Sequence, residues 1–388
     1  MNKKILLGIC VFGLFLRLGY IFFVGADPVF PDEYRFLEEA ESILAGTGLQ
    51  ANGHYGHDMP LTALLVAGVL FISSGSAFAV KIFFGFLSTI TIFLVGRFAF
   101  VLSKDNQSAI LAAGICAVYP FFIFYSSLIL SETLFLFLFV LFLCLLFDED
   151  SSGVRQGISA GLMHLTKPIF FYFFPVIWLW QYFFQKIPVR KILTIALVTG
   201  LVVSPWVIRN FLVFDELVIN TASSGHILWE GNNPWNNTGG VSGTFQNPDA
   251  WLNVVPDGLT ELEEDQWKEN QAINFVKRNP VVFVENGIRK FLRLWSLWPN
   301  SAEHQSWIFK AISILSFGPM LLFSLIGVWA LKENRREIAL MVGLVGYITL
   351  LHVVTLGSIR YRLPLESIMI VIASMTLKNF YKRYNQNK

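Results

Sequence analysis

Long, predominantly apolar runs of residues recur along most of this chain. A hydrocarbon layer roughly 30 Å thick needs about 20 apolar residues per helix, and segments near that length recur. The runs are continuous rather than alternating, which predicts helices and not strands. We therefore expect an all-α polytopic membrane protein. The apolar segments lie at 5–24, 60–73, 78–101, 108–124, 130–147, 157–166, 168–184, 191–208, 306–331, 338–356 and 364–377.

Segment 60–73 is the shortest isolated one and decides the topology. If it crossed the membrane, the basic loop 186–191 would face outside, against the tendency of Lys and Arg to stay inside. If it lies at the interface instead, every basic turn falls on the cytoplasmic side. This arrangement predicts about ten spanning helices in the plasma (inner) membrane.

The same topology divides the chain into parts. Residues 1–209 form an N-terminal transmembrane catalytic module whose first outer loop is 25–77, and residues 306–388 form the C-terminal transmembrane helices. Between them, 210–305 is too polar to cross and is predicted to be an extracytoplasmic loop or small domain. Within it, 263–279 and 281–298 have the pattern of amphipathic helices.

Composition supports the membrane class and excludes one kind of partner. Hydrophobic residues make up 54% of the chain and charged residues only 14%, which is too apolar for a single water-soluble core. The net charge of +2 comes from Lys and Arg scattered over short loops, so no nucleic acid partner is expected.

Charged residues that interrupt the apolar pattern all fall at the outer ends of helices in this topology. Each one alone has an alternative interpretation as an interfacial residue whose charged group reaches into water. Their gathering on one face favours a functional site. They are Asp32, Glu33, Lys81, Glu132, Lys167, Arg209, Arg360 and Arg362.

Two adjacent acids follow the first apolar segment, in Pro31-Asp32-Glu33-Tyr34. Pro31 begins a predicted surface helix, 32–45, that Gly46 ends. Asp32 has an alternative role as a cap of this helix. A carboxylate near the membrane surface, beside several cations, suits a lipid phosphate as substrate. Asp32 would act as general base, and the cations would stabilise the leaving phosphate.

At these residues the chain resembles the GT-C glycosyltransferases, in the branch of protein O-mannosyltransferases and lipid A aminoarabinose transferases. The acidic first-loop motif is followed, in the order and spacing of that branch, by further short motifs. These are Tyr119-Pro120, Tyr125-Ser126-Ser127, Ser131-Glu132, Leu165-Thr166-Lys167-Pro168, Ser204-Pro205-Trp206-Val207-Ile208-Arg209-Asn210, Gly231-Asn232-Asn233-Pro234 and Arg360-Tyr361-Arg362-Leu363-Pro364.

The resemblance implies a GT-C-type helical bundle and assigns roles by position. Asp32 would be the catalytic base, Glu33 its neighbour in the motif and Glu132 the second acidic position. Lys167, Arg209, Arg360, Arg362 and, less directly, Lys81 would contact the donor phosphate or the acceptor. Tyr34, His57, Asn232 and Asn233 are further candidates for substrate binding, although His57-Asp58-Met59-Pro60 departs from the family's His-Pro-Pro turn.

The sequence neither requires nor excludes a metal site. Some relatives bind a divalent metal, and His54, His57, Asp58, Glu33 or Glu132 could supply ligands here. Their spacing fits no strict metal motif, so no cofactor is required and a divalent metal is only an option.

Together these features predict a membrane glycosyltransferase. It would move a sugar from a polyprenyl-phosphate carrier to an extracytoplasmic acceptor, which is a protein, a lipid or a cell-envelope glycan, by inverting displacement. One alternative is a transporter or flippase for lipid-linked sugars, which would keep its polar site near the middle of the membrane. Another is a polymerase or ligase of surface polysaccharide.

Overall fold

A computed structural model of the chain describes residues 2–240, 254–300 and 306–386. The described residues contain helices and no strand, as expected. Six helical segments among them are long and apolar enough to cross a membrane, and the chain is a multi-pass membrane protein. They are α1 (Lys3–Val24), α4 (Ala77–Ser103), α10 (Val189–Phe214), α16 (Trp307–Ala330), α17 (Arg335–Val354) with the preceding turn η4 (Lys332–Asn334), and α18 (Leu363–Gln386) with the preceding turn η5 (Ile359–Arg362).

Several predicted spans are shorter or divided in the structure, so the expected number of about ten stays a prediction. The apolar segment 108–124 becomes α5 and α6, because Pro120 cannot donate the hydrogen bond that would continue α5. The segment 168–184 is likewise divided into a 3-10 helix, a short α-helix and a short π-helix. The shorter elements are α5 (Asn106–Val118), α6 (Pro120–Tyr125), α7 (Ser131–Phe147), α8 (Gly153–His164), η1 (Pro168–Phe173), α9 (Phe174–Trp180) and η2 (Gln181–Gln185).

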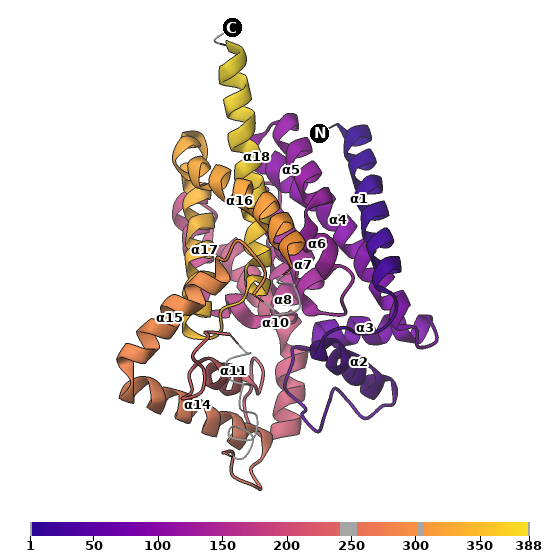
Figure 1. Cartoon of the computed structure of the whole chain (residues 1–388), viewed down its shortest axis with the longest axis vertical. Coiled ribbons are helices and arrows are strands. Elements are labelled where there is room, and N and C mark those ends of the chain that lie inside the picture. The colour runs from indigo at the N-terminus through magenta and orange to yellow at the C-terminus, as the bar shows by residue number, and fades with distance from the viewer. Residues whose placement is uncertain (1, 241–253, 301–305, 387–388) are drawn as a thin grey trace.

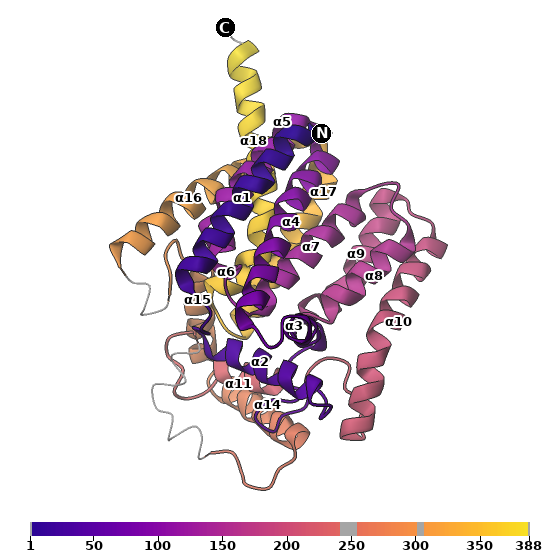
Figure 2. The ribbon, with the colours of Figure 1, turned by 90° about the vertical axis from the view of Figure 1, so that its right-hand side faces the viewer.

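The apolar core of the bundle surrounds α18. This helix contacts α16, α5, α4 and α7, and its residues from Leu363 to Thr376 are buried. In both ribbon views it runs through the middle of the bundle (Figures 1 and 2). Because η5 precedes α18 directly, the packing of this central helix fixes the position of Arg360.

A buried arginine repairs the break between α5 and α6. Pro120 leaves backbone carbonyls at the end of α5 without their usual donors. Arg17 of α1 donates from Nη1 to Ala117 O at 3.0 Å, from Nη2 to Cys116 O at 3.3 Å, and from Nε to Ser88 Oγ of α4 at 2.8 Å. Arg17 therefore joins three helices without an acidic partner among these contacts.

Glycines allow α8 and α10 to pack closely. A Cβ at Gly157 would lie 2.7 Å from Val198 Cβ, and one at Gly161 would lie 2.6 Å from Val202 Cβ. Small residues spaced four apart on a helix let a second backbone approach, which is common between membrane helices. The contact fixes the end of α8, where Lys167 follows.

The remaining helices gather at one end of the bundle, which we call the loop end. α2 (Pro31–Leu44) and α3 (Pro60–Ile72) lie across the long helices there and not along them, and α11 (Ser224–Gly231), α14 (Glu261–Arg278) and α15 (Pro280–Leu294) lie at the same end (Figures 1 and 2). The helices expected at 32–45, 263–279 and 281–298 are confirmed, with shifted ends. The crosswise position of α3 agrees with the interfacial placement of 60–73.

Candidate functional site

Four charged side chains form a continuous network at the loop end. Arg360 donates from Nη1 to Asp32 Oδ2 at 2.5 Å, from Nε to Glu132 Oε1 at 2.5 Å and from Nη2 to Glu132 Oε2 at 3.1 Å. Lys167 Nζ donates to Glu132 Oε1 at 2.6 Å. Residues up to 328 positions apart in the sequence thus share one ion-pair network.

Each member of this network lies at the end of a different element, which explains why they meet. Asp32 is in the first turn of α2, directly after Pro31, and Glu132 is in the first turn of α7. Lys167 lies between α8 and Pro168, and Arg360 is held in η5 by Ser358, whose Oγ accepts from the Arg360 N–H at 3.3 Å. Carboxylates near helix N-termini are also stabilised by the helix dipole.

A second pair extends the network toward the first loop. Arg35 donates from Nη1 to Asp32 Oδ1 at 3.2 Å and from Nε to Asp58 Oδ2 at 2.5 Å. The His57 Nδ1 lies 3.3 Å from the same Asp58 oxygen. Asp32 is therefore held between two guanidinium groups.

Exposure distinguishes the two acids of the network. The Asp32 side chain keeps 30% of its surface exposed, whereas Glu132 keeps 3%. A substrate can therefore reach Asp32, while Glu132 lies behind Arg360 and Lys167 and orients them.

The surroundings shift the acidity of the carboxyl groups on α2 and in the first loop. Burial raises the pKa of Asp32, but Arg360 and Arg35 outweigh that effect and bring the pKa below its ordinary value. Burial also raises the pKa of Asp58, and His57 and Arg35 bring it well below the ordinary value. Glu39 differs: burial and the charge of Asp58 raise its pKa from 4.5 to about 8.

Two predicted site residues, Glu33 and Lys81, form hydrogen bonds with backbone groups instead of joining the network. Glu33 is fully buried and accepts from the N–H groups of Val29 at 2.8 Å, Phe30 at 3.1 Å and Ile129 at 2.8 Å, so it caps α2 and joins it to the segment before α7. Lys81 is fully buried and donates to the carbonyls of Gly25 at 3.1 Å and Asp27 at 2.7 Å.

Two predicted arginines also lie outside the network. Arg209 donates to the carbonyls of Leu49 at 2.8 Å and Tyr55 at 2.6 Å, which ties the first loop to α10. Arg362 is fully buried, pairs with Glu366 at 2.6 Å and stacks 3.6 Å from the centre of the Phe317 ring. Their charges serve internal partners.

The two candidate amides stabilise a turn, and Tyr34 lies at the surface. Asn232 is buried, donates to Val354 O at 2.9 Å and accepts from Lys290 Nζ at 3.0 Å. Asn233 is buried and accepts from the Trp235 and Asn236 N–H groups at 3.0 and 2.9 Å. The Tyr34 side chain is exposed, and its hydroxyl donates to Pro28 O at 3.4 Å.

The possible metal ligands do not gather into one site. Within the described ranges, no three His, Cys, Asp or Glu side chains are arranged to hold a metal ion. His57 and Asp58 are adjacent, but Glu33 caps α2 and Glu132 pairs with Lys167 and Arg360.

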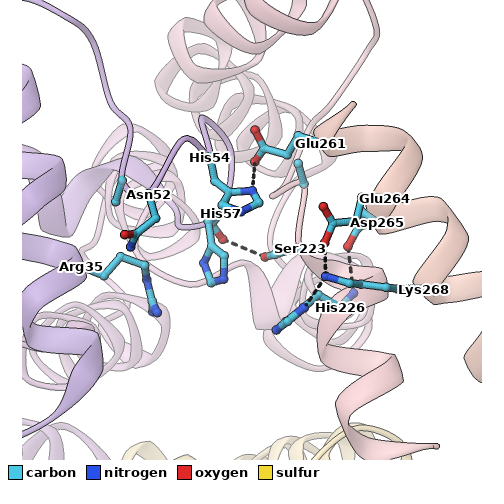
Figure 3. Close-up of a pocket in the computed structure, with 12 residues that line it drawn as sticks. Arg35, Asn52, His54, His57, Ser223, His226, Glu261, Glu264, Asp265 and Lys268 are labelled. Atoms are coloured by element: carbon cyan, nitrogen blue, oxygen red, sulfur yellow. Dashed lines mark hydrogen bonds and ion pairs between the residues drawn. The ribbon is translucent and has the colours of Figure 1, made fainter. Parts of the chain in front are cut away.

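A cavity of about 260 Å³, lined mostly by polar and charged residues, adjoins the network through Arg35 and His57. We call it the α14 cavity. Figure 3 shows its lining side chains, which come from the first loop, residues 222–226 and α14.

Sequence reasoning missed Arg35 and gave Asp58 only as a possible metal ligand. A signal for Arg35 exists, because residues three apart on a helix are neighbours and Arg35 follows Asp32 at that spacing on α2. The sequence contains no comparable signal for the contact between Arg35 and Asp58.

Comparisons with known proteins identify the fold. No protein-family model matches the chain, and no curated protein sequence matches it. The apo oligosaccharyltransferase of Archaeoglobus fulgidus aligns over 98% of this chain and 50% of that chain, with a TM-score of 0.57 and 14% identity. The archaeal oligosaccharyltransferase AglB from Archaeoglobus fulgidus, in complex with an inhibitory peptide and a dolichol-phosphate, covers the same shares with a TM-score of 0.51 and 14% identity.

A further match is ArnT from Cupriavidus metallidurans bound to undecaprenyl phosphate. It aligns over 96% of this chain and 76% of that chain, with 12% identity, and its TM-score of 0.46 is too low to infer a shared fold. The oligosaccharyltransferase matches confirm the expected GT-C-type fold. The chain spans about half the length of those archaeal proteins.

Proposed function

We propose that the chain is a membrane glycosyltransferase that takes a sugar from a polyprenyl-phosphate donor. The observation that carries this proposal is the network in which an accessible carboxylate, Asp32, shares Arg360 with the buried Glu132–Lys167 pair. A base and a phosphate-binding pair of cations are the two chemical functions that such a transfer needs.

The proposed step is a direct displacement at the anomeric carbon. The acceptor hydroxyl oxygen forms a bond to that carbon while the bond from the carbon to the phosphate oxygen breaks. The hydroxyl proton goes to the Asp32 carboxylate, and the bonding electron pair leaves with the polyprenyl phosphate. The attack comes from the face opposite the leaving group, so the configuration inverts.

Arg360 and Lys167 would hold the departing phosphate. A guanidinium can bind two phosphate oxygens, and the ammonium adds a compact charge beside it. Glu132 would keep both cations in place, since its carboxylate contacts each of them in the absence of substrate. Arg35 would hold Asp32 during the reaction.

Two further observations support this proposal. The AglB structure that shares the fold is described in complex with a dolichol-phosphate and an inhibitory peptide, a lipid phosphate and a possible type of acceptor. Lys186 precedes α10, Arg190 and Lys191 lie in its first turn, and the network lies at the loop end, where α10 leads. The positive-inside tendency supports an extracytoplasmic position for the network.

Mass spectrometry of cell-envelope lipids and proteins, with and without the gene, tests the function. We expect one sugar to be missing in the deletion strain and restored by the wild-type chain and by Glu41→Gln, an exposed acid on α2. Asp32→Asn should not restore it. Full restoration by Asp32→Asn, or transport of a lipid-linked sugar without any transfer, would contradict the proposal.

A further inference from the structure

The α14 cavity is built from segments outside the long apolar helices. The first loop contributes Asn52, His54 and His57, and α14 contributes Glu261, Glu264, Asp265 and Lys268. A polyprenyl chain must stay in the hydrocarbon layer, so a ligand of this cavity approaches from the aqueous side. Its volume of about 260 Å³ is slightly below the usual range for small-molecule sites, which suits one compact polar group.

Hydrogen bonds within the chain hold the walls of the cavity together. Glu261 of α14 accepts from the N–H groups of Tyr55 at 2.7 Å and Gly56 at 2.9 Å in the first loop. Asp265 accepts from the N–H groups of Gly225 at 3.1 Å and His226 at 2.8 Å. The cavity is therefore already formed, which lowers the entropy cost of binding.

The charges of the lining disfavour an anion. The lining contains three carboxylates, Glu261, Glu264 and Asp265, and two cationic side chains, Arg35 and Lys268. The Lys268 ammonium already has partners within the chain, since its Nζ donates to Glu264 at 2.5 Å and lies 3.0 Å from His226 Nδ1. An incoming phosphate or carboxylate would meet three acids against two cations, whereas an uncharged group would not be repelled by these acids.

The first loop adds side chains with hydrogen-bonding groups to the cavity lining. Within the described residues the Asn52 carboxamide has no hydrogen-bond partner, and His54 lies at the edge with 43% of its side chain exposed. The His54 and His57 rings are neighbours, with centres 6.4 Å apart (Figure 3). The His226 ring lies 6.0 Å beyond His57, and its nitrogens contact Lys268 and Glu230. Amides and imidazoles can both donate to and accept from hydroxyl groups.

Arg35 connects the cavity to the proposed base. It lines the cavity, and its Nη1 donates to Asp32 while its Nη2 has no partner within the described parts of the chain. A hydroxyl oxygen that accepts from Nη2 would therefore be brought next to the carboxylate that takes its proton.

We infer that the α14 cavity binds the acceptor, and that the acceptor presents an uncharged, hydroxyl-rich group such as a single sugar ring. This inference rests on the proposed function, because an acceptor is needed only if a sugar is transferred. Arg35 is then a positioning residue for the attacking hydroxyl.

Saturation-transfer NMR on the purified full chain tests the inference, in a detergent that contains no sugar. The probes are methyl glycosides of common hexoses and, as the anionic comparison, glycerol phosphate. We expect saturation of at least one glycoside and none of glycerol phosphate. His54→Trp should fill the cavity and abolish the glycoside signal, whereas Tyr55→Trp, at the neighbouring position outside the lining, should keep it.

Binding of undecaprenyl phosphate to the same samples separates the two proposals. If wild type and His54→Trp bind the lipid equally, the variant is folded and only the cavity has changed. Glycoside binding that survives His54→Trp, preferential saturation of glycerol phosphate, or no glycoside binding at all would overturn the acceptor site. If the wild type does not bind undecaprenyl phosphate, this result would instead contradict the proposed function.

Discussion

At the scale of single residues, Arg360 already donates hydrogen bonds to two carboxylates, Asp32 and Glu132. It contacts Asp32 and both oxygens of Glu132. A donor phosphate would compete with Asp32 for the same guanidinium. Donor binding would then free Asp32 from the cation that lowers its pKa most, and so make it a stronger base.

This competition makes an uncommon prediction about the proposed base. Asp32→Asn should abolish sugar transfer and yet bind undecaprenyl phosphate more tightly, by roughly tenfold or about 1.4 kcal/mol. The reason is that the amide competes less for Arg360. The measurement is lipid binding to purified protein, with Glu41→Gln as the matched control on the same helix. Weaker binding by Asp32→Asn would show that phosphate and Asp32 do not share Arg360.

Glu39 predicts a pH dependence of stability. Its side chain is 1% exposed, and its Oε2 has no hydrogen-bond partner within the described residues. The folded-state pKa of about 8 is above the ordinary 4.5, so the folded chain keeps a proton that the unfolded chain loses. This contribution to stability is complete below pH 4.5 and is lost as the pH rises from 4.5 through about 8, by roughly 5 kcal/mol.

The variant Glu39→Gln cannot ionise and removes this dependence. Its melting temperature in detergent should fall less than that of wild type between pH 5 and pH 9. Glu41→Gln, which changes an exposed acid, should follow wild type. Parallel curves for Glu39→Gln and wild type would mean that Glu39 is already ionised at pH 5.

The sequence could identify charged positions but not their partners. Asp32, Glu132, Lys167 and Arg360 share one network, as their common location at helix ends suggested. Lys81 shows the same pattern of one charge in an apolar run, yet it binds backbone carbonyls. The difference lies in which atoms face each charge after folding, and no local spacing encodes that.

At the scale of helices, the contact between α8 and α10 depends on missing side chains. Gly157→Ala would place a Cβ 2.8 Å from Ile195 O and 2.7 Å from Val198 Cβ, which forces the helices apart. We expect a loss of about 1–3 kcal/mol. Gly200→Ala on α10 meets nothing within 4 Å and should be neutral or gain up to about 1 kcal/mol.

Thermal melting of both variants in detergent measures this difference. Equal melting temperatures for Gly157→Ala and Gly200→Ala would show that α8 and α10 do not pack closely. Because α8 leads to Lys167, we also expect Gly157→Ala to weaken binding of undecaprenyl phosphate, while Gly200→Ala leaves it unchanged.

The sequence predicted where helices lie better than where they are interrupted. The pattern of Pro31 and Gly46 around 32–45 predicted α2 to within a residue at either end. The run 108–124 is uniformly apolar, yet Pro120 divides it, and Arg17 stabilises the division from another helix. Hydropathy records the apolar environment but not where a backbone hydrogen bond is interrupted.

At the scale of the whole molecule, the charged network and the basic loops occupy opposite ends of α10. This helix has 26 residues, so at about 1.5 Å per residue it extends roughly 39 Å and can cross the hydrocarbon layer. Arg190 lies in its first turn, and the chain after its end leads to α11 and α14. The proposed extracytoplasmic reaction requires that these two ends face different compartments.

Cysteine labelling with a membrane-impermeant maleimide tests that requirement in intact cells. Asp257 and Arg190 are both exposed, and a cysteine at either site would be accessible from its own compartment. We expect Asp257→Cys to be labelled in intact cells and Arg190→Cys only after permeabilisation. The chain with its natural cysteines gives the background, which should be low because Cys116 and Cys144 are buried and Cys10 is half-buried in α1. Labelling of both positions from one side would place the α14 cavity and the basic loop in the same compartment, and α10 could then not cross the membrane as a single span.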